Sequence, residues 1–170
     1  MNTFTACRRL AVAAALLGYL GLGTAQQAAA DDTINQYGYW ASVLDTTSDG
    51  HRICGVRTDL DGGAQLRLMV VGDAVHLVAH DPNWDLPANA TSRVMIVVDD
   101  QTFNGTAEVV DGQTLLVTNL TKDFLEQFVD GSEMLANFGG VRWSVNLVGS
   151  GRATSDMVSC IAATRSGLVS

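Results

Sequence analysis

In Val141-Arg-Trp-Ser-Val-Asn-Leu-Val-Gly-Ser-Gly-Arg-Ala153 an apolar strand runs into a glycine turn and then into a helix. In the first half the apolar residues alternate with polar ones, which is the pattern of a strand with one buried face: Trp143, Val145 and Leu147. After the turn, the less polar residues recur at helical spacing: Ala153, Met157, Cys160, Ile161 and Thr164. The pattern predicts the closing strand of a sheet and a last helix that packs on it, with Ser150 as the expected N-cap.

Upstream of this stretch, the chain consists of short strand patterns joined by turn-forming residues. The turn clusters are Thr46 to Gly50, Asp59 to Gly63, Gly72-Asp73, Asp99-Asp100 and Asp111-Gly112. Between Tyr37 and Thr118 no helical pattern separates successive strands, which argues against a parallel α/β fold. One further short helix is expected, capped by Thr121 and ended by Gly131. We therefore predict an all-β, single-domain antiparallel sandwich or barrel-like fold of about nine strands with two short helices, one of them C-terminal.

The first thirty residues have the features of a secretory signal peptide. Arg8 and Arg9 precede an apolar run, and Ala28-Ala29-Ala30 offers a cleavage site after Ala30. Gly23-Thr24-Ala25 is a second candidate cleavage site. The apolar run, Leu10 to Leu22, is shorter than the roughly 20 residues that a membrane-spanning helix requires, so we expect no membrane span after cleavage. The protein is expected to be periplasmic or secreted. The sequence leaves open which of the two it is, and whether export uses the general or the twin-arginine route.

The remainder is the size of one domain, which we divide into a flexible leader at 31–36, a single β-rich domain at 37–165 and a C-terminal tail at 166–170. The net charge of the full chain is −8, and it becomes more negative once Arg8 and Arg9 are removed. Because phosphate binding depends on clustered Lys and Arg, nucleic acid is not an expected partner. The acidity either keeps an exported protein soluble or attracts a basic protein partner.

Export leaves Cys54 and Cys160 as the only pair of cysteines, in a compartment where disulfides form. A bond between them would tie an early strand to the last helix. It would close a loop of about 100 residues, which the chain-entropy model values at up to about 4.7 kcal/mol. A metal site is the alternative, but the two cysteines lack a Cys-x-x-Cys spacing or a nearby histidine. We predict the disulfide, and no metal or other cofactor.

No catalytic motif accompanies the three histidines. His76 and His80 would lie on one face of a strand about 13 Å apart, too far to share a metal ion, and are expected to be exposed. His51 falls in a turn. The adjacent carboxylates of Asp99 and Asp100 would point to opposite faces of a strand, so they are expected to be turn residues. The sequence therefore predicts a protein that is not an enzyme, with a hydrolase whose site assembles from distant residues kept as an alternative.

The loop Asp81-Pro82-Asn83-Trp84-Asp85-Leu86-Pro87 places one large aromatic residue between the only two prolines of the chain. Trp84 either closes the end of the β fold from inside or anchors a partner. The binding hypothesis names Trp84 together with the flanking Asp81 and Asp85. A partner at this loop would be a protein of the cell envelope.

Several of these features occur together in a known family. Trp40, Cys54, the loop around Trp84, the strand end Val97-Val98-Asp99 and Leu147 to Ala153 before Cys160 resemble small exported bacterial proteins of the invasion-associated locus B type. The resemblance covers about residues 40–160. It implies a periplasmic or envelope-associated β-rich domain with no established enzymatic activity and no catalytic residues to carry over. We expect a non-catalytic binding or envelope-interaction role, with a periplasmic inhibitor of a basic enzyme such as lysozyme as the more specific alternative.

Overall fold

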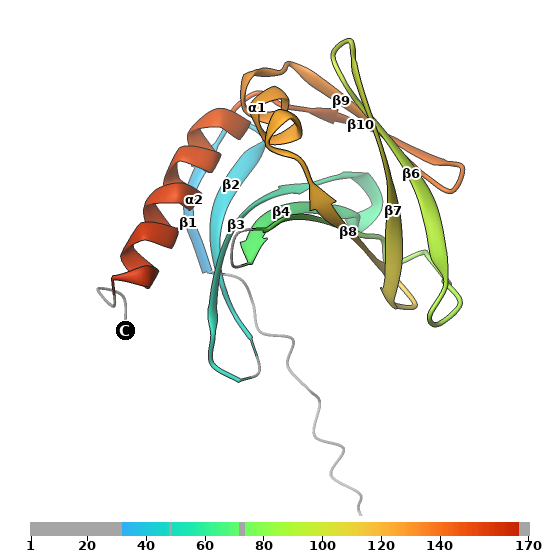
Figure 1. Cartoon of the computed structure of the whole chain (residues 1–170), viewed down its shortest axis with the longest axis horizontal. Coiled ribbons are helices and arrows are strands. Elements are labelled where there is room, and N and C mark those ends of the chain that lie inside the picture. Colours follow the sequence, from blue (N-terminus) through green and yellow to red (C-terminus); the bar gives the residue numbers. More distant parts are fainter. Residues whose placement is uncertain (1–31, 48, 72–73, 167–170) are drawn as a thin grey trace, which may run out of the picture.

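A single, strongly curved antiparallel sheet forms the body of the molecule (Figure 1). The computed structural model describes residues 32–47, 49–71 and 74–166. Within these residues ten strands pair in the order β1-β2-β3-β4-β5-β8-β7-β6-β9-β10. Their bounds are β1 Asp32–Tyr37, β2 Trp40–Thr46, β3 Arg52–Asp59, β4 Gln65–Val71, β5 Ala74–His80, β6 Thr91–Val98, β7 Gln101–Asp111, β8 Thr114–Leu120, β9 Glu133–Phe138 and β10 Val141–Asn146. The helices are α1 Lys122–Asp130 and α2 Ser150–Arg165, with a 3-10 turn, η1, at Asp61–Gly63. The predicted all-β fold with two helices is confirmed.

The sheet curls until its two ends approach each other, and the helices cover the gap (Figure 1). The backbone N–H of Tyr39, in the β1–β2 turn, donates to the carbonyl of Val148 just after β10 at 3.2 Å. Beside it the indole N–H of Trp40 donates to the carbonyl of Asn146 at 2.8 Å. Helix α2 packs on β1, β2 and β3, and α1 packs on α2. The arrangement is therefore a barrel that is closed by one backbone bond, one side-chain bond and a helix rather than by a continuous ladder.

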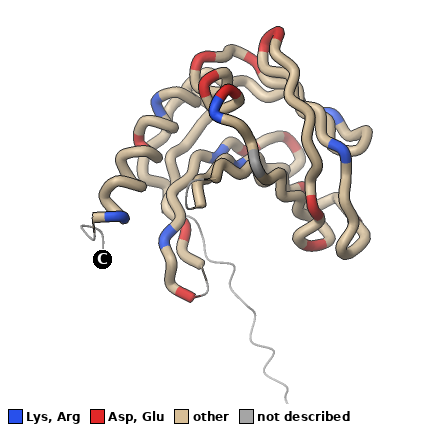
Figure 2. The backbone as a smooth tube through the Cα atoms, viewed as in Figure 1, with Lys and Arg blue, Asp and Glu red and all other residues tan. Residues whose placement is uncertain are grey.

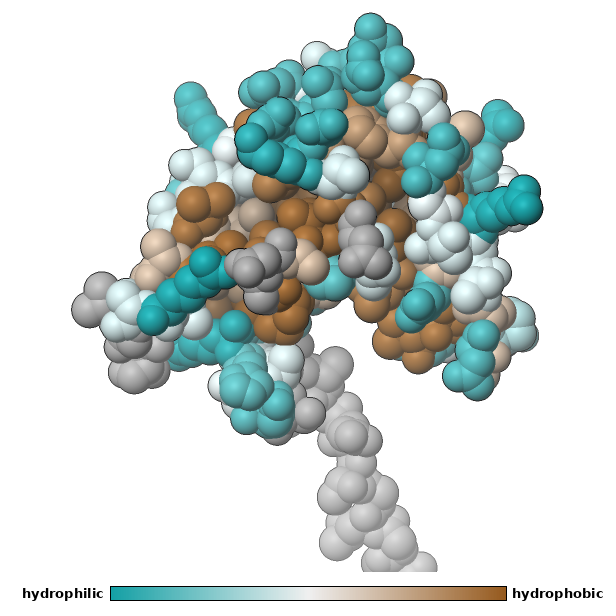
Figure 3. Space-filling model, viewed as in Figure 1, coloured by the Kyte–Doolittle hydropathy of each residue, from teal (hydrophilic) through white to brown (hydrophobic). Residues whose placement is uncertain are grey.

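Alternating residues of the strands face inward and build one apolar core. Fully buried side chains from β4, β5, β6 and β9 contribute to it, including Leu66, Leu77, Ile96 and Met134. The ring of Trp40 lies edge-on to Phe128 of α1, with ring centroids 4.8 Å apart. Figure 3 shows the apolar residues in the hollow of the barrel and the hydrophilic ones around its rim. Helices thus close a core that the sheet alone would leave open.

The first strand lies where we expected a flexible leader. Residues 32–37 form β1 and pair with β2 in antiparallel register, with a bulge between Thr33 and Asn35. The side chains from Thr33 to Gln36 are exposed, so no apolar alternation marks the strand in the sequence. Pairing to β2 and hydrogen bonds to α2 hold it instead. The predicted signal peptide, residues 1–30, lies outside the described residues, as do residues 167–170 of the predicted tail.

The helix ends confirm one predicted cap and correct the other. The Thr121 hydroxyl accepts a hydrogen bond from the N–H of Phe124 at the start of α1, as expected. At α2 the N-cap is Gly149, with φ 101°, and Ser150 is the first helical residue. A side chain at Gly149 would place its Cβ 1.8 Å from the carbonyl oxygen of Tyr37, so only glycine fits this turn. Ser150 is buried and donates its hydroxyl to the Phe128 carbonyl at 2.8 Å.

The predicted disulfide is present and joins β3 to α2. Cys54 and Cys160 are bonded, with Cα atoms 5.9 Å apart and 106 positions between them in sequence. Cys54 is buried, while Cys160 is half-buried on the inner side of α2. The bond therefore fixes the last helix to an early strand. No helix within the described residues is long and apolar enough to cross a membrane.

A carboxylate on α2 ties down the edge strand β1, and it predicts a pH dependence. Asp156 accepts hydrogen bonds from the Tyr37 hydroxyl at 2.8 Å, from the Asn35 amide at 2.7 Å and from the Ser42 hydroxyl at 3.3 Å. The bonds from Tyr37 and then Asn35 lower the pKa of Asp156, because they stabilise the ionised form. The same bond raises the pKa of Tyr37.

We expect the stability contributed by Asp156 to be fully present above the pKa of the unfolded carboxyl, about 3.9. It should be lost as the pH falls through the lower pKa of the folded state, because the unfolded chain then binds the proton more readily. Urea unfolding of the wild type and of Asp156→Asn between pH 2 and 7 measures this. The variant should be less stable than the wild type at pH 7, and the difference should shrink at the acid end. A difference that stays constant over this range would contradict the assignment.

Candidate functional site

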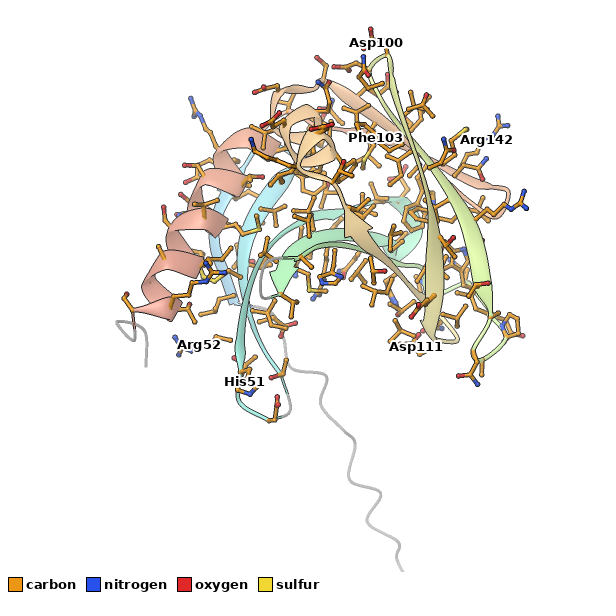
Figure 4. The ribbon with its side chains drawn as sticks, viewed as in Figure 1. His51, Arg52, Asp100, Phe103, Asp111 and Arg142 are labelled. Carbon is orange, nitrogen blue, oxygen red and sulfur yellow. A yellow bond between two sulfur atoms is a disulfide. The ribbon has the colours of Figure 1, made fainter. Side chains whose placement is uncertain are left out.

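A hollow of about 380 Å³ lies beside β10, between its open edge and the turn that joins β3 to β4. One wall consists of Arg142, Ser144 and Asn146 of β10. The opposite wall runs from Thr58 through η1 to Ala64, with Asp81 beside it. We call this hollow the β10 cleft. Figure 4 labels Arg142 on the flank of the molecule away from α2.

Two aromatic rings, Trp143 and Tyr39, line the β10 cleft. Trp143 is half-buried and stacks on Trp84 with ring centroids 5.2 Å apart and planes within 5° of parallel. Phe138 lies against both indoles in tilted, edge-type contacts. Tyr39 is 60% exposed. Trp84, itself half-buried, therefore packs against the ring of Trp143 that lines the cleft.

Carboxylates dominate the charge of the cleft, with Asp59, Asp61 and Asp81 against the single guanidinium of Arg142. Asp59 is partly engaged, because its carboxylate lies 3.5 Å from Nε of Arg57 and accepts from the Gln65 amide at 2.9 Å. Asp81 accepts from the backbone and side-chain amides of Asn83 at 2.9 and 3.0 Å, which fixes the loop. Figure 2 shows acidic residues at many of the turns and strand ends.

Of the three residues proposed for binding, Trp84, Asp81 and Asp85, only Asp81 lines the β10 cleft. Trp84 stacks on Trp143, which lines it. Trp84 also lines a second, more apolar hollow of about 270 Å³ on its other side, together with Leu86 and Phe138. Asp85 is exposed in the same loop and is not part of the lining of either hollow.

Within the described residues, the hydroxyl and histidine side chains lie at several separate places in the fold. The hydroxyl of Ser144 donates to Glu133 at 2.6 Å, and that of Thr58 donates to the carbonyl of Tyr39, but neither bonds to a histidine. His51 lies beside Asp49 at the tip of the β2–β3 hairpin (Figure 4). His80 contacts the Thr114 hydroxyl at 3.2 Å. No group of three metal-ligating side chains occurs in the part of the chain that the structure describes.

His76 and His80 share the outward face of β5, as the alternation predicted, but both are half-buried rather than exposed. The neighbouring strands explain the difference. His76 lies opposite Met69 of β4, and His80 lies between Gln65 of β4 and Thr114 of β8. A central strand carries neighbours on both sides, so a residue on its outer face is partly covered.

Sequence reasoning missed most of the β10 cleft. Asp59 and Asp61 were interpreted as turn residues and Arg142 and Ser144 as the solvent face of a strand, which is correct for each element alone. What joins them is the strand order, in which β10 pairs with β9 and leaves its other edge open near the β3–β4 turn. No local pattern in the sequence records that order.

The comparisons with known proteins show a structural relationship. The chain is similar to the crystal structure of invasion associated protein B from Bartonella henselae, with a TM-score of 0.54 and 14% sequence identity. The match covers 75% of this chain and 96% of that one. No family model matches the chain, and no curated protein sequence does. At this identity the likeness is one of fold.

Proposed function

We propose that this protein is an exported, non-catalytic module that binds a basic protein partner at the β10 cleft. The observation that carries the proposal is the cleft itself, which presents three carboxylates and two aromatic rings beside an open strand edge. Aromatic rings supply contact area with little loss of conformational entropy, and carboxylates steer a basic partner toward them. A scaffold closed by a disulfide gives this surface a fixed shape.

The compartment follows from separate observations. The Cys54–Cys160 disulfide is of the kind that persists outside the reducing cytosol. Arg8, Arg9 and the apolar run after them have the composition of a signal peptide. The likeness in fold to invasion associated protein B agrees with an extracytoplasmic protein. We therefore propose periplasmic or secreted localisation after cleavage near Ala30.

The more specific alternative is an inhibitor of a basic enzyme such as lysozyme. It uses the same charge argument, since an overall charge of −8 and an acidic cleft favour encounter with a cationic surface. It differs in its consequence, because an inhibitor must cover an active site as well as bind. A hydrolase at the β10 cleft is disfavoured because the histidine–hydroxyl contact described above, between His80 and Thr114, lies outside the lining of the cleft.

Titration against lysozyme, with cytochrome c as an unrelated basic protein, tests the proposal. We expect association at low salt that weakens about tenfold or more when the ionic strength is raised to about 0.5 M, because screening shortens the reach of charge pairs. Loss of lysozyme activity on binding would support the inhibitor hypothesis. Binding without loss of activity would support a binding module that does not inhibit. No association with either protein at low salt would contradict both.

Charge variants locate the contact. The double variant Asp61→Asn and Asp81→Asn should weaken binding about tenfold, since it removes two of the carboxylates that line the cleft. Asp100→Asn removes a charge from the β6–β7 turn, away from Arg142 in Figure 4, and should change affinity less than about twofold. Equal effects of the double variant and of two remote substitutions, Asp100→Asn with Asp49→Asn at the tip of the β2–β3 hairpin, would place binding elsewhere on the surface.

A further inference from the structure

We propose that the open edge of β10 recognises its partner by strand addition, pairing with an extended segment that carries Lys or Arg. This inference rests on the proposed function and specifies its mode. Among the described strands, β10 and β1 end the sheet, and only β9 pairs with β10. A sheet edge with outward N–H and C=O groups is a template for another strand.

The register of the β9–β10 hairpin fixes which backbone groups point outward. Phe138 and Val141 close a two-residue turn, and the pairs continue without interruption to Glu133 and Asn146. In an antiparallel ladder the bonded pairs alternate, so Val141, Trp143 and Val145 bond to β9 while Arg142, Ser144 and Asn146 direct their backbone groups away from it. The bond from the Trp40 indole to the Asn146 carbonyl agrees with that direction.

The usable edge therefore runs from Val141 to Ser144, about 13 Å at 3.3 Å per residue. Beyond it the edge is already occupied, by Trp40 at Asn146 and by Tyr39 at Val148. Arg142 and Ser144 are exposed and line the β10 cleft, so an added strand would lie along the cleft wall. Two residues of the added strand can exchange backbone bonds with these two positions.

The other end strand is protected against the same pairing. β1 carries a bulge between Thr33 and Asn35, which breaks the regular spacing of its edge. Its side chains at Asn35 and Tyr37 are bonded to Asp156 of α2. β10 has neither feature in its described pairing. Of the two end strands, β10 is therefore the one whose regular edge can pair with another strand.

Charge complementarity identifies the occupant as a basic segment. A strand added to β10 would face Asp59, Asp61 and Asp81 across the cleft, and the rings of Trp143 and Tyr39 can pack on the aliphatic stems of Lys or Arg. A second copy of this chain is disfavoured, because pairing β10 with β10 would bring two sets of these carboxylates to one shared edge.

The test uses a synthetic peptide of alternating valine and lysine, a version with glutamate for lysine, and a version with N-methyl groups at alternate amides. We expect the lysine peptide to bind and to shift the amide resonances of Arg142 and Ser144 in a ¹⁵N–¹H spectrum. Ser144→Pro deletes one outward N–H and leaves the bonds to β9 in place, because proline is tolerated at such edge positions. It should weaken binding about tenfold or more, whereas Ser144→Ala should change it less than about twofold.

The outcomes separate this inference from the proposed function. Weak binding by Ser144→Pro and by the N-methylated peptide, with normal far-ultraviolet circular dichroism of the variant, supports strand addition. Equal binding of the methylated and unmethylated peptides overturns strand addition, and if binding still depends on Asp61 and Asp81 the proposed function stands. Failure of the lysine peptide to bind at low salt also overturns strand addition. The lysozyme titration tests the proposed function separately. A concentration-dependent dimer abolished by Ser144→Pro would make a second copy the occupant and overturn the basic segment.

Discussion

Removing the disulfide is expected to lower the free energy of unfolding by about 2–5 kcal/mol. The bond closes a loop of 106 positions and joins β3 to α2, so its loss frees the unfolded chain over most of the domain. Urea unfolding of the double variant Cys54→Ala and Cys160→Ala, compared with oxidised wild type, measures the effect. The midpoint should fall, whereas the slope should rise, because the unfolded state without the cross-link exposes more surface.

Reduced wild type is the matched control for this experiment. It lacks the bond but keeps both thiols, so it should lose nearly the same stability as the double variant. Equal stability of the reduced and the oxidised protein would contradict this prediction. It would mean that packing alone keeps α2 on β3 and that the disulfide adds no stability. Alkylation followed by mass measurement confirms the redox state of each sample.

Trp40→Ala is expected to cost about 3–5 kcal/mol, the range for truncating a large buried aromatic side chain. Trp40 is fully buried, packs edge-on against Phe128, and donates its indole N–H to Asn146 across the gap between β2 and β10. Trp40→Phe should fall between wild type and Trp40→Ala, because it keeps most of the apolar contact and loses the hydrogen bond. Thermal or urea unfolding gives both values.

Tyr39→Ala provides the neighbouring control. Tyr39 is 60% exposed, and its hydrogen bonds to Val148 and Thr58 use backbone atoms, which alanine retains. We expect a change below about 0.5 kcal/mol. Comparable losses at both positions would contradict the expectation that the buried indole of Trp40, rather than the exposed ring of Tyr39, stabilises this corner.

The fold could be predicted from sequence because its signals are local. The Asp111-Gly112 turn, the alternation after Val141 and the Thr121 cap each identify an element within a few residues of its observed bounds. Cys54 and Cys160 could be paired because only two cysteines remain after the leader. These inferences require no knowledge of which strands are neighbours.

Strand β1 and the β10 cleft could not be predicted in the same way. β1 shows no alternation of apolar and polar residues and depends on Asp156, more than a hundred residues away in sequence. The cleft depends on the order of strands across the sheet, which brings Asp61 and Ser144 to one hollow. Ser150 was assigned as the N-cap because serine is common there, but the backbone turn at Gly149 moved the cap by one residue.

The elements that close the barrel, β10 and α2, follow the other strands in the sequence and are therefore synthesised after them. This sets an order of events during biogenesis. As the chain emerges N-terminus first, β2 and β3 have no cover from α2 until that helix arrives. Completion of the core therefore waits for α2, whichever machine delivers the chain. Cys54 likewise waits for Cys160, and the only other thiol available to it in the meantime is Cys7. If residues 1–30 are removed before oxidation, as the sequence predicts, that incorrect pairing would be eliminated, and proteolytic processing would act as a proofreading step for the disulfide.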